Sequence, residues 1–128
     1  MTHLRISECA DLLGVSDDTV RRLVDAGALP AQRDTSGRKV VTGADLAAYV
    51  SAQASEPQER HSSSARNRFR GLVTNVTTDA VMAQVEMQCG SFRVVSLMSA
   101  ESVRDLGLEV GTVATAVIKS TAVIVETR

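Results

Sequence analysis

Apolar residues in the first fifty positions recur at the spacing of three to four residues that is typical of amphipathic helices. Ser7 begins the first such run, and Gly14 ends it. Ser16 is an N-cap residue for a second run, which Gly27 ends. A helix, a short turn and a second helix make up the helix-turn-helix pattern, so the sequence predicts that motif here.

A pattern of short strands follows the second predicted helix. Residues 29–33 and 38–41 flank the turn-forming segment 34–37, so we expect a β-hairpin with basic side chains on both arms. Thr42 is then a cap for a third helix, over residues 43–50. The first fifty residues therefore predict a small domain of three helices and a hairpin.

The middle of the chain has no apolar periodicity. Residues 51–62 are polar and include Pro57, which is typical of a flexible linker. Beyond this segment the pattern changes from that of helices to that of strands. We therefore predict two domains, over residues 1–50 and 63–128, joined by a linker over residues 51–62.

Five short strands and one short helix are predicted in the second domain. The strands cover residues 68–76, 80–87, 92–98, 112–118 and 122–126. Ser99 is an N-cap for a helix over residues 100–106, and Gly107 ends that helix. So many short strands with one helix indicate a small five-stranded, OB-like β-barrel, and the fold class of the whole chain is predicted to be α+β with two domains.

Composition restricts the classes of protein to which the chain can belong. The 128 residues carry a formal net charge of −1, which excludes a globally basic nucleic-acid binder and still permits a local basic patch. Aromatic residues make up only 2% of the chain, so the cores must consist of Val, Leu, Ile and Ala. Small domains of this kind are marginally stable alone, and we therefore expect a homo-oligomer.

The cysteines and histidines do not form a metal-binding or disulfide pattern. Cys9 and Cys89 lie in different predicted domains, so we expect two buried free thiols in a reducing, cytoplasmic compartment. His3 and His61 lie near the start of the chain and in the linker, and no metal site is expected. No apolar run is long enough to span a bilayer, so we expect neither a signal peptide nor a membrane partner.

Four motifs in residues 4–50 occur in the order of a known DNA-binding domain. They are residues 6–16, 19–23, 26–30 and 37–38. Together they resemble the winged helix-turn-helix of the MerR and excisionase families, in which the second helix enters the major groove and the hairpin wing contacts phosphates. The resemblance implies double-stranded DNA as a partner. It places Thr19, Arg21 and Arg22 on the groove-facing helix, and Arg33, Arg38 and Lys39 on the wing.

The charges on the second helix also have a simpler interpretation. Asp18 and Arg22, and likewise Arg21 and Asp25, are four residues apart. Pairs at that spacing stabilise an ordinary solvent-exposed helix. The basic residues therefore predict either DNA contact or ion pairs within the helix.

Three separated motifs in the second domain occur at the positions of another known family. They are residues 64–67, residues 99–111 with Gly107 and Gly111, and residues 117–120. Together they resemble the molybdate-binding Mop domain of the molbindins, a member of the TOBE family. The resemblance implies molybdate or tungstate as the bound ligand, with no organic cofactor and no metal other than the molybdenum of the oxyanion. It also implies binding sites between subunits and assembly as a hexamer.

The residues in these motifs suit a tetrahedral dianion. Such an ion presents only acceptors, so its site needs cations, hydroxyls, amides and free backbone N–H groups. The candidate oxyanion-binding residues are Ser64, Arg66, Asn67, Ser99, Ser102, Lys119 and Ser120. Each also has a plain structural alternative: Ser99 and Ser102 can be N-cap residues alone, and Lys119 can pair with Glu86 or Glu126.

Three functions are compatible with these patterns. The first is a molybdate- or tungstate-responsive DNA-binding transcriptional regulator. The second is a molbindin-type protein for intracellular molybdate storage. The third is an excisionase-like DNA-architectural protein whose β-domain serves only for oligomerisation. We do not expect an enzyme, because the sequence offers no nucleophile–base arrangement, metal cluster or glycine-rich phosphate loop.

Overall fold

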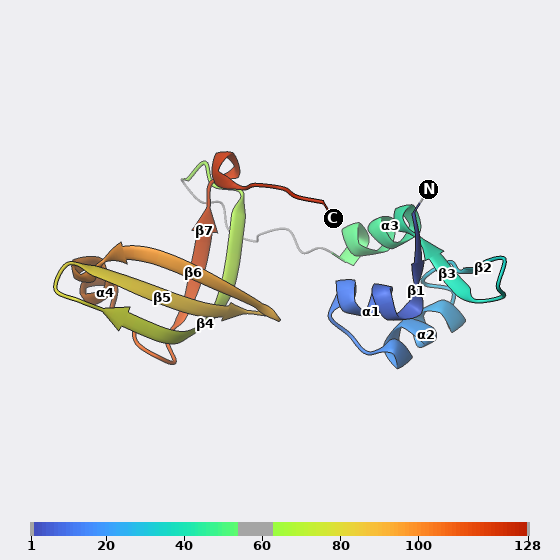
Figure 1. Ribbon diagram of the computed structural model, residues 1–128, viewed down its shortest axis with the longest axis horizontal. Coiled ribbons are helices and arrows are strands. Elements are labelled where there is room, and N and C mark those ends of the chain that lie inside the picture. The colour runs from blue at the N-terminus through green and yellow to red at the C-terminus, as the bar shows by residue number, and fades with distance from the viewer. Residues whose placement is uncertain (1, 54–62, 128) are drawn as a thin grey trace. The chain divides into compact units, whose positions relative to one another are not determined.

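The chain divides into two compact units, Met1–Glu59 and Arg60–Arg128. The computed structural model describes residues 2–53 and 63–127, and each unit has its own hydrophobic core. In Figure 1 the first unit runs from blue to green and the second from yellow-green to red. None of the described helices is both long enough and apolar enough to cross a membrane.

The first unit is a three-helix domain with a small antiparallel sheet (Figure 1). Its elements are β1 (His3–Arg5), α1 (Ile6–Leu13), α2 (Asp17–Asp25), β2 (Gln32–Arg33), β3 (Lys39–Thr42) and α3 (Gly43–Gln53). The strand order is β1-β3-β2. Strand β1 was not expected from the sequence, and its pairing with β3 places Arg5 opposite Val40.

Local capping chemistry sets the helix boundaries in this unit. The Ser16 hydroxyl accepts a hydrogen bond from the Thr19 N–H (3.2 Å) at the start of α2. The Thr42 hydroxyl accepts one from the Asp45 N–H (3.0 Å) at the start of α3. Gly14 ends α1 with a φ of 70°, a left-handed conformation that glycine adopts without strain. Both predicted N-caps and this helix end are confirmed.

The core of the first unit lies between the three helices and β3. It consists of Cys9, Ala10, Val20, Leu29, Val41 and Leu46. Cys9 is a fully buried free thiol, as predicted. Burial raises the pKa of this thiol, which keeps it protonated and unreactive.

The second unit is a curled antiparallel sheet with one helix (Figure 1). Its elements are β4 (Asn67–Thr78), β5 (Met82–Cys89), β6 (Phe92–Ser99), α4 (Ala100–Leu106), β7 (Val113–Ile118) and a 3₁₀ turn, η1 (Ser120–Ala122). The strand order is β6-β5-β4-β7. The predicted alternation along β5 is confirmed, since Ala83, Val85 and Met87 are buried in the core with Val73. Cys89 is also a buried free thiol.

The predicted fifth strand is wrong for this structure. Residues 122–126 form no ladder with any described strand, so the sheet has four strands instead of five. The η1 turn explains the difference, because the Ala122 N–H donates to the Lys119 carbonyl (2.9 Å) and the Val123 N–H to the Ser120 carbonyl (3.3 Å). This turn directs the apolar tail of the chain away from the sheet (Figure 1).

The predicted linker begins too early. Helix α3 continues to Gln53, so residues 51–53 are helical. The remainder of the predicted linker, residues 54–62, lies outside the described residues.

Candidate nucleic-acid and oxyanion sites

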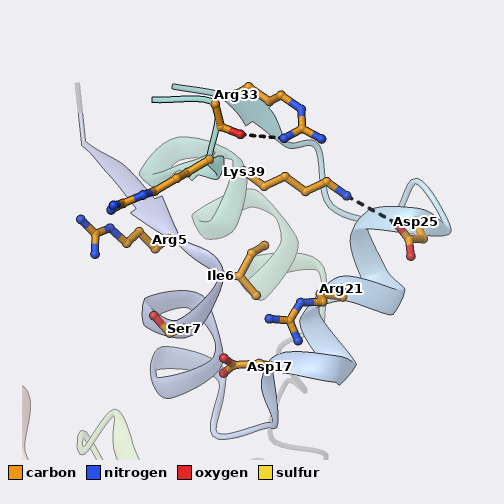
Figure 2. Close-up of a pocket in the computed structure, with 10 residues that line it drawn as sticks. Arg5, Ile6, Ser7, Asp17, Arg21, Asp25, Arg33 and Lys39 are labelled. Carbon is orange, nitrogen blue, oxygen red and sulfur yellow. Dashed lines mark hydrogen bonds and ion pairs between the residues drawn. The ribbon is translucent and has the colours of Figure 1, made fainter. Parts of the chain in front are cut away.

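Basic side chains from three elements of the first unit line one cavity of about 520 Å³. These residues are Arg5 from β1, Arg21 from α2, and Arg33, Arg38 and Lys39 from the β2–β3 hairpin and its turn. In Figure 2, Arg21 extends from α2, Lys39 extends from the hairpin to Asp25 on α2, and Arg33 lies along the hairpin. Asp17 and Asp25 also line the cavity, but the cations outnumber them, so the cavity favours an anion.

The hairpin that carries three of these cations is held by its own hydrogen bonds. One Asp34 carboxylate oxygen accepts the N–H groups of Ser36 and Arg38, both at 2.9 Å. These hydrogen bonds lower the pKa of Asp34 below its ordinary value. The bond from the Arg38 N–H has the larger effect, and the bond from the Ser36 N–H has a smaller one. Arg33 donates to the Gly37 carbonyl across the turn (2.6 Å) (Figure 2). The basic arms are thus presented on a preformed turn.

The ion pairs differ from those that the sequence spacing predicted. Neither Asp18 with Arg22 nor Arg21 with Asp25 forms a pair. Arg21 pairs with Asp18 (3.0 Å), and Asp25 pairs with Lys39 of the hairpin (3.9 Å) (Figure 2). The reason is that Asp25, at the end of α2, faces the sheet. Exposed pairs of this kind contribute at most about 1 kcal/mol to stability, so phosphate groups can compete for these cations.

Four of the six predicted DNA-contacting residues line the cavity, namely Arg21, Arg33, Arg38 and Lys39. Arg22 does not, and Thr19 belongs instead to the N-cap of α2, where its hydroxyl lies 3.0 Å from that of Ser16. Sequence reasoning missed Arg5. The sequence shows Arg5 just before the first helix, which does not by itself indicate a DNA contact. The pairing of β1 with β3 is what brings Arg5 beside the hairpin.

Arg5 also lines a second cavity, of about 620 Å³, together with Arg33 and Asp34. Among residues 2–53 and 63–127, the structure contains no ion pair of Arg5 or Arg38. An external anion would therefore not have to displace an internal ion pair at either of these two guanidinium groups.

In the second unit, the two cationic candidates for oxyanion binding lie at the same end of the sheet. Asn67, the first residue of β4, is opposite Ile118, the last residue of β7. Its side-chain amide donates to the Ile118 carbonyl (3.2 Å). This pairing places Ser64 and Arg66, just before β4, beside Lys119 and Ser120, just after β7. We call these four residues and Asn67 the Arg66–Lys119 cluster.

The cations of the Arg66–Lys119 cluster have no acidic partner in the described part of the chain. Among the described residues, Arg66 donates only to the Ser64 carbonyl, at 3.3 Å. Lys119 pairs with neither Glu86 nor Glu126 among the described residues. Glu86 lies opposite Asn75, farther along β4 than Asn67, and is bonded instead by Arg93, which lowers the pKa of that carboxyl. Two exposed cations with hydroxyl and amide neighbours suit a small oxyanion.

Ser99 and Ser102 lie together at the beginning of α4. The Ser99 hydroxyl accepts the Ser102 N–H (3.0 Å) and donates to the Ser102 hydroxyl (2.8 Å). These contacts are those of an N-cap, the structural alternative for the two serines. Within one chain, neither serine reaches the Arg66–Lys119 cluster.

The register of the sheet shows why the two groups are apart. Ser99 is opposite Met82, and the next residue of β5, Ala83, is opposite Thr78 at the far end of β4. Asn67 is at the other end of this strand of 12 residues, which corresponds to roughly 35 Å along its length at ~3.3 Å per residue. The seven candidates therefore form two groups, and a site that used all of them would need residues from two copies of the chain.

Comparison with known families and proteins agrees with the division into two units. A family model described as TOBE domain matches residues 63–125, and one described as helix-turn-helix domain matches residues 4–54. Molybdenum-pterin-binding protein 3 of Clostridium pasteurianum is 45% identical over 63 residues, which are 48% of this chain and 93% of that protein. A probable molybdenum-pterin-binding protein of Haemophilus influenzae is 41% identical over 63 residues, or 48% of this chain and 91% of that protein.

A solved structure resembles this chain over about half of its length. A molybdate-binding protein from Sporomusa ovata superposes with a TM-score of 0.51 at 30% sequence identity. The match covers 52% of this chain and 100% of that chain. These relatives therefore correspond to about half of the present chain.

Proposed function

This chain belongs to the TOBE domain family, whose matching relatives are molybdenum-pterin-binding proteins, and it also carries a helix-turn-helix domain; from that premise we propose that it is a cytoplasmic, DNA-binding transcriptional regulator that responds to molybdate or tungstate. Its task is binding and not catalysis. The observation that carries the proposal is the Arg66–Lys119 cluster, in which strand pairing brings together two cations that lie 53 positions apart in the sequence.

The chemistry of the Arg66–Lys119 cluster supports a tetrahedral dianion as ligand. Arg66 and Lys119 supply positive charge, and the hydroxyls of Ser64 and Ser120 supply donors that are directional yet uncharged. No carboxylate is paired with either cation among the described residues, so the ligand meets no internal competitor. The names of the relatives point to the same class of ligand.

Self-association completes the proposed site. Ser99 and Ser102 lie too far from the Arg66–Lys119 cluster of their own chain to share a ligand with it. A second copy can bring its α4 beside this cluster. The second unit also exposes large apolar side chains, among them Phe92 (73%) and Leu97 (71%), which are typical of an interface. We propose a homo-oligomer, for which the resemblance to molbindins implies a hexamer.

The first unit supplies the DNA contacts in this proposal. The basic cavity between α2 and the hairpin takes backbone phosphates, with Arg21, Arg33, Arg38 and Lys39 as ligands and Arg5 as an additional one. Oxyanion binding between TOBE units favours one assembly over another. The number of DNA-binding units in each particle then changes, and with it the affinity for DNA.

A second candidate function rests on the coverage of the relatives. The TOBE relatives match this chain over more than nine-tenths of their own length but only about half of its length. An oxyanion-binding unit of this size thus occurs without a helix-turn-helix domain. Storage of molybdate is therefore the alternative role for the second unit.

Calorimetric titration of the full chain with molybdate and with sulfate tests the proposal. We expect saturable heat with molybdate only, and a loss of at least tenfold in affinity for Lys119→Ala, because a charge-assisted bond is worth about 1.5–3 kcal/mol. The matched control is Lys39→Ala, a lysine in the other unit, which leaves the titration unchanged.

A DNA-binding assay with and without molybdate separates the two candidate functions. If molybdate binds but leaves DNA affinity unaltered, storage replaces regulation. If neither molybdate nor tungstate produces heat, both oxyanion functions are ruled out.

A further inference from the structure

We propose that a row of arginines along β4 makes the second unit a further contact surface for the phosphate backbone of duplex DNA. The row consists of Arg66, Arg68 and Arg70, and we call it the β4 arginine row. Arg66 also belongs to the Arg66–Lys119 cluster, so the tests below use only Arg68 and Arg70. The inference rests on the proposed function only in taking duplex DNA as the partner.

The period of the strand places these side chains on one face of the sheet. Arg68 and Arg70 are the second and fourth residues of β4, and they pair with Val117 and Thr115 of β7. Alternate residues of a strand lie on the same face, roughly 6.6 Å apart. Arg66 continues this alternation one step before β4 begins. The three arginines therefore form an evenly spaced row of cations.

This row lies on the face of the sheet that is turned away from the core. Ala116 of β7 packs against the core, and it pairs with Phe69, which lies between Arg68 and Arg70 in the sequence. The two arginines therefore extend from the opposite face. Arg70 and its partner Thr115 are exposed, and Arg68 is half-buried. In Figure 1 this first part of β4, in light green, runs beside β7.

The arginines of the row are not neutralised within the described part of the chain. No ion pair among residues 2–53 and 63–127 includes any of the three. Burial of unpaired charges against apolar surface is costly, so an apolar face of a second copy is a poor partner for this row. A polyanion, in contrast, supplies the charge that the row lacks.

Several acidic side chains of the second unit lie at the opposite end of β4. Asp79 directly follows β4, and Glu101 and Asp105 lie on α4, which begins at the same end of the sheet. Glu109 and Glu126 lie elsewhere, and neither pairs with an arginine of the row. This separation of charge along the sheet directs a polyanion to the arginine row and away from α4.

The regular spacing of the row favours a nucleic-acid backbone over a single small oxyanion. One or two cations already suffice for a small ion, whereas a row of cations matches phosphates that repeat along a strand. Guanidinium groups bind phosphate oxygens through paired N–H donors. Contacts to phosphates carry no sequence information, so the row adds affinity for DNA without changing the preferred sequence.

Mobility shifts of the full chain with duplex DNA over a series of salt concentrations, without molybdate, test the row. The double variant Arg68→Ala with Arg70→Ala is expected to lower the slope of log affinity against log salt by about 2 for each copy that contacts the duplex, because each phosphate contact contributes about 0.9. Arg104→Ala, which removes an exposed arginine of α4, is the matched control and should keep the wild-type slope.

The variant Arg68→Lys with Arg70→Lys separates phosphate contact from a structural role. Lysine keeps the charge, so the wild-type slope should return; a slope that stays low would contradict the inference. An unchanged slope for the double alanine variant would overturn this inference alone and leave the DNA contacts of the first unit in place. A wild-type chain that bound no duplex even at low salt would overturn the proposed DNA-binding function as well.

Photo-cross-linking locates the DNA on the second unit directly. A benzophenone maleimide is attached to Thr115→Cys, beside Arg70, or to Val81→Cys, a 69% exposed position at the acidic end. We expect labelled duplex to cross-link at position 115 and not at position 81. Wild-type chain measures the background, since Cys9 and Cys89 are buried. Equal cross-linking at both positions, or none at position 115, would contradict a contact through the β4 arginine row.

Discussion

The two units of this chain differ in how complete each is by itself. The first unit buries its core among three helices and β3, and its basic cavity is built from one copy alone. The second unit leaves many large apolar side chains exposed, has two free sheet edges, and separates its candidate ligand residues into two groups. The proposed DNA-binding surface therefore lies within one copy of the chain, whereas the proposed oxyanion site combines residues of two copies.

The largest difference in stability between the two units is expected for a substitution at Gly71. A Cβ atom at this position would lie 2.4 Å from the Gln88 carbonyl oxygen and 2.6 Å from the Cys89 sulfur. Gly71→Ala therefore forces β4 and β5 apart and destabilises the second unit by about 1–3 kcal/mol. Calorimetric melting should show the transition of the second unit, but not that of the first, at a lower temperature.

Gly43→Ala is the control for this substitution. The added Cβ atom would have its nearest neighbour at an ordinary 3.5 Å, in the first unit, so both transitions are expected to stay close to wild type. If Gly71→Ala lowered both transitions equally, the two units would not be independent folding units, and the comparison would fail.

The sequence predicted those parts of the molecule that depend on residues close together in the chain. The N-caps at Ser16, Thr42 and Ser99 are confirmed, because a cap involves a side chain and a backbone N–H three residues away. The alternation along β5 is confirmed for the same reason, since every second residue of a strand faces the core.

Features that depend on distant or external partners could not be predicted in this way. Strand β1 has only three residues, and it is defined by pairing with β3, far along the chain. The ion pair of Asp25 with Lys39 likewise joins a helix to a hairpin. Residues 122–126 have a strand pattern, but they pair with no described strand. The fold of each unit was therefore more predictable than the proposed oxyanion site, which combines residues of two copies.

A moderate loss of DNA affinity is expected when Arg5 of the basic cavity is replaced. Arg5→Ala should weaken binding to all duplex sequences alike and lower the slope of log affinity against log salt by about 1, as expected for one phosphate contact. Arg22→Ala is the matched control, because Arg22 does not line the basic cavity, and its salt slope should equal that of wild type. Electrophoretic mobility shifts over a series of salt concentrations give both slopes.

An unchanged slope for Arg5→Ala would restrict the DNA surface to α2 and the hairpin. If that slope instead changed only when molybdate was present, the DNA-binding surface would depend on assembly. The first unit would then not be complete by itself.

The smallest expected effect is on stability at acid pH. Each unit has a turn in which an aspartate accepts backbone N–H groups. Asp34 accepts the N–H groups of Ser36 and Arg38, and Asp79 accepts those of Val81 and Met82. Backbone hydrogen bonds hold the pKa of both carboxyls below the ordinary value of 3.8. The stabilisation is therefore fully present above that value and is lost as the pH falls through the lower pKa of the folded state.

Melting temperatures of Asp34→Asn and Asp79→Asn measured from pH 6 down to about pH 2 test this prediction. Because an amide does not titrate, each variant should lose part of the acid dependence of its own unit and leave that of the other unchanged. The first unit should show this loss at every protein concentration. In the second unit the melting temperature should also depend on protein concentration, since the proposed assembly would stabilise that unit. If the melting temperature of the second unit did not depend on protein concentration, that unit would be stable as a monomer. The two units would then differ in the charge of their surfaces and not in their need for a second copy.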